Sequence, residues 1–509
     1  MILPDQYRAL TVAGGLHLAA RRTPDKIALI EGERRMAYAV LSDRIYRVAR
    51  ALLALGLERG DRVAVLAPNC LEYPEMVCGI GDAGLIAVTL NPREHALEIS
   101  DVLTDSNARV LLLHPAFSAL ARGLVAPAVK QQILIGEEYE QWLTASPADS
   151  ALPQITEFDP FVLVYTSGTT GRPKGLLLPH RARSLLFFAK ALEYGCYGPN
   201  DRFLGIAPMA LGAGFGFGMC VVFFGGCLEI LPAFDAGTVL RKLSDEPFTG
   251  VFMVPSHLQS IFSLPAAVLD RWRGRATTLK AIICNAAALP FALKEQVVNY
   301  FGEGLLHETY GFTEAGVVTN LRPADQLRKP GSVGRAFPQV DVQLLDDQGQ
   351  PVPRGEVGEI FVSSPWLFNG YWKLPQETEA CTRAGLISAG DLARQDEDGC
   401  YYIVDRKKDM VVSGGLNIYP REIEEVLFRH GAVADVAVIG IPDARWGERL
   451  LGVVVIRANH ATDAASLEAY CRTSLAAYKV PREFRFVDAL PRNTSGKVLK
   501  RVLREQATR

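Results

Sequence analysis

A ten-residue segment rich in hydroxyl side chains and glycine, from Thr166 to Gly175, could bind phosphate groups. It reads Thr-Ser-Gly-Thr-Thr-Gly-Arg-Pro-Lys-Gly and follows the apolar run from Phe161 to Val164. Backbone N–H groups and hydroxyls in such a loop can point toward phosphate oxygens, and the lysine adds a positive charge. It is not a Walker A loop, because Pro173 precedes Lys174 and a glycine follows it. The segment predicts polyphosphate binding, although its composition alone also fits a polar turn.

Six further short motifs occur in order along nearly the whole chain. They are Gly60-Asp61-Arg62-Val63-Ala64, Tyr310-Gly311-Phe312-Thr313-Glu314, Gly370-Tyr371-Trp372, Gly390-Asp391, Asp405-Arg406-Lys407-Lys408-Asp409 and Pro491-Arg492-Asn493-Thr494-Ser495-Gly496-Lys497. Together with the loop they resemble the signatures of the adenylate-forming superfamily. That superfamily includes acyl-CoA synthetases, aryl-CoA ligases, firefly luciferase and the adenylation domains of peptide synthetases. The pattern is most similar to that of acyl- or aryl-CoA ligases.

The resemblance implies a two-step reaction on a small carboxylic acid. A carboxylate oxygen attacks the α-phosphorus of ATP, which gives an acyl-adenylate and pyrophosphate, and the acyl group then passes to CoA. The implied cofactors are ATP and Mg²⁺, with CoA as co-substrate. Two alternatives stay open: an acyl-AMP ligase that loads a carrier protein, and a homologue that performs only one half-reaction.

The resemblance also assigns roles to individual residues. Lys497, Thr313 and Glu314 are the expected catalytic residues, and Glu314 is the expected Mg²⁺ ligand. A lysine cation beside the reacting phosphate would act electrostatically. The residues expected to bind ATP are Thr166, Ser167, Gly168, Thr169, Thr170, Gly171, Lys174, Ala286, Ala287, Glu308, Thr309, Tyr310, Gly311, Thr313, Asp391, Arg406 and Lys497.

Four residues of the C-terminal region are expected to serve the second half-reaction. In the family a C-terminal domain rotates about a hinge, and Lys408 occupies the hinge position. Gly414 and Gly415 would line the passage for the incoming thiol, and Trp446 would stack on the adenine of CoA. Trp446 could equally be a packed anchor of a small domain.

Three positions depart from the family pattern. Leu211 stands where histidine or an aromatic residue commonly gates the acyl pocket. Ala286 lies in Asn-Ala-Ala-Ala-Leu where Gly-Gly-Ala-Pro-Leu is usual, which reduces backbone freedom beside the adenine. Glu308 stands where asparagine or glutamine is common, and a carboxylate near a triphosphate is electrostatically unexpected.

The residues expected by position to line the acyl pocket are small or apolar. They are Phe187, Leu211, Gly212, Ala213, Gly214, Ala286, Gly311 and Gly316. None of them is an arginine or lysine that could pair a second carboxylate, and a buried unpaired carboxylate is costly. We therefore expect a monocarboxylic acid that is aromatic, alicyclic or polycyclic, or of medium chain length.

The elements that must position these residues alternate between helix and strand patterns. Leu41, Ile45, Val48 and Leu52 have helical spacing, and a strand-like run from Arg62 to Leu66 follows. This rhythm predicts an α/β fold: a large N-terminal domain of layered, parallel-rich sheets and helices, and a smaller, mobile α+β C-terminal domain. We expect domains at 1–404 and 411–509, a hinge at 405–410, and a small β-rich subdomain at about 331–404.

Composition excludes several other classes of protein. The net charge of −2 provides no global field for nucleic acid, and nine scattered cysteines indicate free thiols in a reducing compartment. The N-terminus does not read as a signal peptide, so a cytoplasmic enzyme is expected. The uncharged stretch from Phe203 to Leu228 is long enough for a membrane span, but its seven glycines favour a buried segment of close backbone approach. Both a monomer and a homodimer stay open.

Overall fold

The computed structural model describes residues 8–146, 150–166, 174–492 and 498–507. The chain divides into two compact units. The first comprises Met1–Asp341 and Val362–Ile387, and the second comprises Val342–Phe361 and Ser388–Arg509. Residues 388–404 and the predicted hinge at 405–410 therefore lie in the second unit, and rotation about that hinge stays a prediction.

The larger sheet of the first unit has nine strands, of which six adjacent strands run parallel. Its order is β15-β14-β13-β12-β11-β9-β10-β1-β2, with antiparallel strands at both edges. The strands are β1 (Ile27–Glu31), β2 (Arg34–Ala37), β9 (Arg202–Gly205), β10 (Cys227–Ile230), β11 (Gly250–Met253), β12 (Ala281–Cys284), β13 (Leu306–Phe312), β14 (Gly316–Leu321) and β15 (Arg335–Ala336). Apolar, nearly continuous strands such as β11 and β12 are typical of a sheet covered on both faces.

The second sheet of this unit has seven strands in the order β18-β8-β7-β4-β3-β5-β6. They are β3 (Arg62–Leu66), β4 (Ile86–Thr89), β5 (Val110–Leu113), β6 (Gln131–Leu134), β7 (Pro160–Thr166), β8 (Lys174–Pro179) and β18 (Gly370–Tyr371). Strands β3 to β7 pair in parallel, and β8 and β18 add antiparallel. The predicted parallel-rich α/β class is confirmed.

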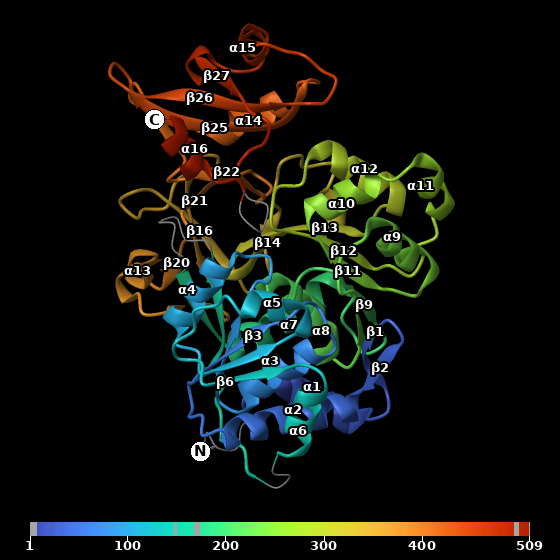
Figure 1. Ribbon diagram of the computed structural model, residues 1–509. Coiled ribbons are helices and arrows are strands. Elements are labelled where there is room, and N and C mark those ends of the chain that lie inside the picture. The colour runs from blue at the N-terminus through green and yellow to red at the C-terminus, as the bar shows by residue number, and fades with distance from the viewer. Residues whose placement is uncertain (1–7, 147–149, 167–173, 493–497, 508–509) are drawn as a thin grey trace. The chain divides into compact units, whose positions relative to one another are not determined.

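Helices alternate with these strands, as the periodicity predicts (Figure 1). Leu41, Ile45, Val48 and Leu52 are fully buried on one face of α2, where α1 and α3 contact it. The helices of the first unit are α1 (Val12–Arg22), α2 (Tyr38–Ala54), α3 (Glu72–Asp82), α4 (Ala96–Ser106), α5 (Ser118–Ala121), α6 (Glu137–Thr144), α7 (His180–Tyr194), α8 (Gly212–Phe223), α9 (Ala236–Asp245), α10 (Pro255–Phe262), α11 (Ala266–Trp272), α12 (Phe291–Phe301) and α13 (Pro375–Ala380), with short 3₁₀ turns η2 (Pro115–Phe117) and η3 (Pro323–Asp325).

The uncharged stretch from Phe203 to Leu228 is divided among β9, α8 and β10. The glycines do permit close approach, since a Cβ on Gly214 would lie 2.1 Å from the carbonyl oxygen of Pro208. These glycines lie in a helix, although glycine has a low helix propensity. Packing outweighs propensity here. Among the described residues, we find no helix with the length and apolar character that crossing a membrane requires.

The second unit is β-rich, and its described residues include three α-helices. Strands β16 (Asp341–Leu345), β17 (Gly358–Ser363), β21 (Asp391–Gln395) and β22 (Tyr401–Arg406) share a sheet, to which the hairpin β19 (Thr382–Arg383) and β20 (Leu386–Ile387) adds beside the end of β17. The last sheet holds β23 (Val411–Ser413), β24 (Leu416–Ile418), β25 (Val433–Asp443), β26 (Gly447–Ile456) and β27 (Glu483–Phe486), with α14 (Pro420–Phe428), α15 (Ala464–Arg472), η4 (Ala477–Lys479) and α16 (Lys500–Ala507). Helix α14 begins at Pro420, a residue that suits the first turn of a helix.

Candidate functional site

The predicted phosphate loop joins the two strands of a hairpin. Thr166, the last residue of β7, pairs with Lys174, the first residue of β8. Both flanking residues are thereby fixed by an antiparallel ladder within the seven-stranded sheet. The predicted ligands Ser167, Gly168, Thr169, Thr170 and Gly171 lie outside the described residues.

Lys174 is held by the segment that follows β18. Its Nζ lies 2.5 Å from Glu377 Oε2 on α13 and 5.6 Å from the centre of the Tyr371 ring. Tyr371 is fixed in turn by α13, because its backbone N–H donates to Thr378 Oγ1 over 2.9 Å. The lysine of the predicted phosphate loop therefore lies against the Gly370-Tyr371-Trp372 motif.

Glu314 lies in the turn between β13 and β14, where Tyr371 also contacts it. The Tyr371 hydroxyl donates to Glu314 Oε1 over 2.5 Å, and the N–H of Phe368 donates to the Glu314 carbonyl over 2.9 Å. Burial, and after it the charge of Glu314, raise the pKa of Tyr371, so its hydroxyl stays a donor. Both the backbone and the carboxylate of the predicted metal ligand are thus positioned.

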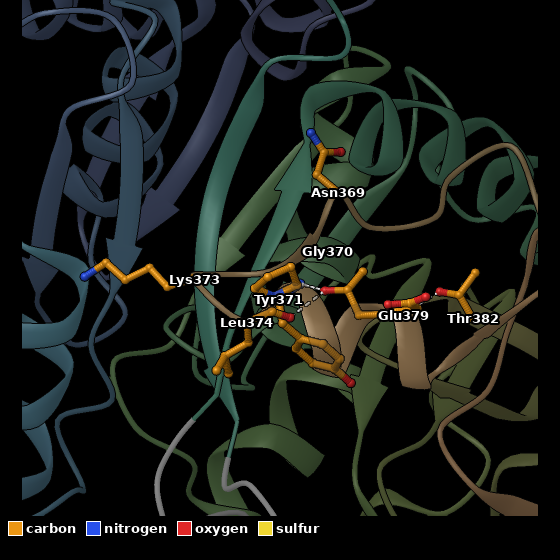
Figure 2. Close-up of a pocket in the computed structure, with 9 residues that line it drawn as sticks. Asn369, Gly370, Tyr371, Lys373, Leu374, Glu379 and Thr382 are labelled. Carbon is orange, nitrogen blue, oxygen red and sulfur yellow. Dashed lines mark hydrogen bonds between the residues drawn. The ribbon is translucent and has the colours of Figure 1, made fainter.

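A cavity of about 610 Å³ lies beside this contact (Figure 2). It is lined by Asn369, Gly370, Tyr371, Lys373, Leu374, Pro375, Thr378, Glu379 and Thr382. Figure 2 shows Lys373 extending away from the other labelled side chains. The cavity is formed by β18, α13 and the residues that flank them, and it shares Tyr371 with the predicted metal site.

We expect Tyr371→Phe to lower the apparent affinity for Mg²⁺ in the ATP-dependent reaction by about 10- to 100-fold, because an orienting hydrogen bond to a metal ligand is lost. Titrating Mg²⁺ at fixed ATP checks the result. Tyr300→Phe is the matched control, since that hydroxyl donates to the Leu269 carbonyl on a different part of the unit. Equal Mg²⁺ dependence in the two variants would contradict the assignment.

The predicted adenine segment begins at the carboxyl end of β12. Asn285 Nδ2 donates to Thr309 Oγ1 on β13 over 2.6 Å, which ties two of the predicted adenine-binding regions together. Ala286 and Ala287 are exposed, and Ala286 has φ = 80°, in the left-handed region. The expected loss of backbone freedom thus takes the form of strain, because alanine occupies a conformation that suits glycine.

We expect Ala286→Gly to raise the free energy of unfolding by about 0.5–1 kcal/mol, because relief of left-handed strain exceeds the added entropy of the unfolded chain. Ala287→Gly is the matched control, since Ala287 is not among the residues with positive φ. The control should lower stability by about 0.4–1 kcal/mol. Urea unfolding measures both, and a loss of stability in Ala286→Gly would contradict the strain.

Glu308 is neutralised by a buried lysine that the sequence analysis did not consider. Lys294 Nζ on α12 lies 2.7 Å from Glu308 Oε2, and the two side chains are only 2% and 7% exposed. Glu308 Oε1 also accepts a hydrogen bond of 3.2 Å from the N–H of Leu289. The Glu308 carboxylate therefore pairs with a lysine of the protein itself and also contacts the predicted adenine segment.

Several of the predicted acyl-pocket residues lie on helix α7 or close to it. Gly311 and Gly316 meet in the β13–β14 hairpin, where a Cβ on Gly311 would lie 1.9 Å from the Gly316 carbonyl oxygen. A Cβ on Gly316 would lie 2.9 Å from Leu186 Cδ2 of α7. Leu186 was not predicted, whereas the predicted Phe187 is fully buried against Phe223, with ring centres 5.3 Å apart.

Leu211, Gly212, Ala213 and Gly214 form the N-terminus of α8 and the residue before it. The preceding turn is held by Asn69, whose Oδ1 accepts from the Met209 N–H over 2.8 Å and whose Nδ2 donates to the Ala207 carbonyl over 3.0 Å. The turn before the position that gates the acyl pocket in the family is thus anchored to the loop that follows β3.

In the second unit, Asp391 and Arg406 are paired across β21 and β22. Arg406 Nε lies 2.9 Å from Asp391 Oδ1, and Asp391 is buried. Lys408 is exposed, and its neighbours Lys407 and Asp409 are each held in ion pairs, with Asp347 and Arg504. Lys497 lies outside the described residues.

Gly414 and Trp446 meet in the same unit. The N–H of Gly414 donates to the Trp446 carbonyl over 2.8 Å, and a Cβ on Gly414 would lie 2.7 Å from Trp446 Cε3. The guanidinium groups of Arg445 and Arg482 lie 4.8 and 5.3 Å from the centre of the partly exposed indole ring. Trp446 is partly exposed, and its ring lies next to the guanidinium groups of Arg445 and Arg482.

The sequence profile of the AMP-binding enzyme family matches residues 16–372. This chain is an AMP-binding enzyme. The profile of the C-terminal domain of AMP-binding enzymes matches residues 422–497. The region between the two matches contains the predicted hinge.

Curated proteins of this family resemble the AMP-binding enzyme along nearly its whole length. It is 38% identical over 495 residues to the feruloyl-CoA synthase of an Amycolatopsis species, with 96% of this chain and 97% of that protein covered. It is 35% identical over 517 residues to the medium/long-chain-fatty-acid–CoA ligase FadD8 of Mycobacterium tuberculosis, with 96% and 88% covered. Among solved structures, ATP-bound MatB from Rhodopseudomonas palustris superposes with a TM-score of 0.89 at 30% identity, covering 98% and 99%. The family membership predicted from the seven motifs and the α/β fold predicted from the helix–strand rhythm are both confirmed.

Several side chains that shape the site of this AMP-binding enzyme were not singled out in sequence. Tyr371 belongs to a recognised motif, and that motif was the available signal. The roles of Asn69 and Lys294 could not be predicted from neighbouring residues. Their partners Met209 and Glu308 lie elsewhere in the sequence, and no short motif links either pair.

Proposed function

We propose that this AMP-binding enzyme is an ATP-dependent acid:CoA ligase that works through an acyl-adenylate. The observation that carries the proposal is the convergence of Lys174 and Glu314 on Tyr371. A phosphate-loop cation and a metal-binding carboxylate are thereby set against the same side chain. Such a pair suits the neutralisation of a polyphosphate while a second anion attacks it.

In the first half-reaction a carboxylate oxygen forms a bond to the α-phosphorus, and the bond from phosphorus to the pyrophosphate oxygen breaks. Lys174 and the loop that it closes would bind the departing phosphates, and Thr313 would contact the α-phosphate. Mg²⁺ needs only one or two protein carboxylates when phosphates complete its shell, and Glu314 offers one. The ion would supply charge neutralisation and Lewis acidity.

In the second half-reaction the CoA sulfur attacks the acyl carbon, AMP leaves, and the thiol proton is released. Trp446 supports CoA over a carrier protein as the acceptor. Its partly exposed ring offers a stacking face for adenine, and Arg445 and Arg482 add positive charge for the phosphates of CoA. The acyl body that fits the apolar, glycine-lined positions is aromatic, alicyclic or polycyclic, or of medium length. Nine free thiols support a reducing compartment such as the cytoplasm.

Pyrophosphate exchange over a panel of carboxylic acids tests adenylation, and thioester detection with CoA or a carrier protein then tests the acceptor. Exchange with at least one acid and a thioester with CoA are the expected results. Absence of exchange with every acid would overturn the function, and transfer to a carrier protein alone would overturn the choice of CoA.

We expect Lys408→Ala to leave pyrophosphate exchange within about threefold of the unmodified enzyme and to slow thioester formation about tenfold or more, because a hinge residue governs domain rotation rather than adenylation. Lys407→Ala is the matched control, since Lys407 is tied to Asp347 and Glu359. Equal losses in both half-reactions for Lys408→Ala would remove the hinge assignment.

A further inference from the structure

Two cationic side chains of α7 lie against α8 without a carboxylate partner. Arg183 and Lys190 are seven residues apart and so share one face of the helix. A Cβ on Gly216 of α8 would lie 3.0 Å from Arg183 Nη1 and 3.5 Å from Lys190 Nζ. Among the described residues, neither cation forms an ion pair with an Asp or Glu side chain.

Lys190 is buried, whereas Arg183 is half-buried with its Nε atom inaccessible to water. Lys190 is 2% exposed, and its Nζ donates to the Gly216 carbonyl over 2.9 Å and lies 3.8 Å from the centre of the Phe217 ring. Arg183 Nε has no accessible surface and no hydrogen-bond partner within the described structure. Burial lowers the pKa of Arg183 to about 10 and that of Lys190 to about 7.

Glycine creates the space that the guanidinium occupies. A Cβ on Gly212 would lie 2.8 Å from Arg183 Nη2, so a larger residue at 212 or 216 would force the guanidinium to shift from this position. Gly212 is also the first residue of α8, where the helix dipole is positive and favours an anion. The N-terminus of α8 therefore adds to the positive potential around Arg183 and does not neutralise the charge of the guanidinium.

This cation borders the expected acyl pocket. Gly212, which Arg183 contacts, is one of the predicted pocket residues. Leu186, one turn further along α7, contacts Gly316, another of them. None of the predicted pocket residues is basic, which argues against a substrate with a second carboxylate. In the structure, however, Arg183 lies next to one of them, Gly212.

We propose that Arg183 is the residue that sets acid specificity, by binding a second carboxylate at the far end of the acyl substrate, with Lys190 adding positive charge. The proposal rests on the proposed acid:CoA ligase function. A partly desolvated cation is stabilised when an anion pairs with it, and a dicarboxylic acid supplies that anion each time it binds. An apolar acyl body between the two carboxylates fits the aliphatic and glycine positions.

The test compares paired acids in pyrophosphate exchange: unbranched monoacids and their ω-dicarboxylic counterparts of equal chain length, and benzoate with its para-carboxylate counterpart. In the unmodified enzyme kcat/KM should be higher for the diacid of at least one pair. Arg183→Met should lower kcat/KM for that diacid about 30-fold or more, as expected when one partner of a desolvated charge pair is removed, and should leave or raise the value for the monoacid.

Arg181→Met is the matched control, because Arg181 lies two residues away on α7 and is already paired with Glu157. It should leave the preference between diacid and monoacid unchanged. Gly216→Ala keeps the test decisive if Arg183→Met does not fold, since alanine favours the helix while its Cβ displaces the guanidinium. That variant should lower kcat/KM for the diacid roughly tenfold.

Exchange with monoacids alone, or an equal effect of Arg183→Met on both acids of a pair, would overturn the proposal and leave the ligase function intact. Absence of exchange with every acid would instead overturn the ligase function itself.

Discussion

Replacing Lys294 with methionine is expected to lower the free energy of unfolding of the first unit by about 3–5 kcal/mol, because Glu308 is left as a buried, unpaired carboxylate. The pair is 2.7 Å apart and almost without solvent exposure, so water cannot take over the role of the lysine. Urea unfolding followed by fluorescence measures the change. A loss of only about 1 kcal/mol, as for an exposed ion pair, would contradict the prediction.

Two controls separate the buried charge from the loss of a side chain. Lys294→Met combined with Glu308→Gln should recover most of the stability, because the amide oxygen still accepts from the N–H of Leu289 while the charge is gone. Arg47→Met removes one partner of an exposed pair with Asp43 in the same unit and should change stability by no more than about 1 kcal/mol. Failure of the double variant to recover would attribute the loss to packing.

The consequence of this pair for function follows from its position. Glu308 precedes Thr309 and Tyr310 on β13 and accepts from Leu289 at the end of the adenine segment. The carboxylate thus joins two regions that the family resemblance assigns to the base of ATP. We infer that the substitution for asparagine or glutamine is tolerated because Lys294 on α12 accompanies it.

Local patterns in the sequence predicted the elements well. The strand from Arg62 to Leu66 and the helix that contains Leu41 and Leu52 match, since an apolar run between turn residues and apolar residues at helical spacing are determined by neighbours in sequence. The glycine-rich stretch was the exception. Its helix α8 exists because glycine lets the backbone pack against Pro208, which is a tertiary effect.

The site was predictable to the extent that it consists of motifs. Glu314, Lys174 and Tyr371 all lie in motifs and converge in the first unit. The pairing of Lys294 with Glu308 and the contact of Arg183 with Gly212 depend on which helix faces which strand or helix. No spacing along the chain encodes those contacts, so the charge balance of the pocket became visible only in three dimensions.

Lys497→Ala is expected to slow pyrophosphate exchange by about 10²- to 10³-fold, because one preorganised cation that stabilises the transition state is lost. The proposed reaction brings two anions together at the α-phosphorus. Lys174 and a metal held by Glu314 would serve the departing phosphates, so the attacking carboxylate would need a cation of its own. Lys497→Arg keeps the charge and should retain more activity than the alanine variant.

A matched cation nearby makes that result specific to Lys497. Arg501 lies four residues further along, is exposed on α16 and is paired with Glu505 within the same helix. Arg501→Ala should leave exchange within about threefold, because an exposed pair of this kind contributes little. Single-turnover measurement of acyl-adenylate formation then places the loss in the first half-reaction, whereas Lys408→Ala affects the second. If Lys497→Ala and Arg501→Ala slowed exchange equally, the loss would reflect general positive charge in this region, and the assignment of Lys497 as the catalytic lysine would be wrong.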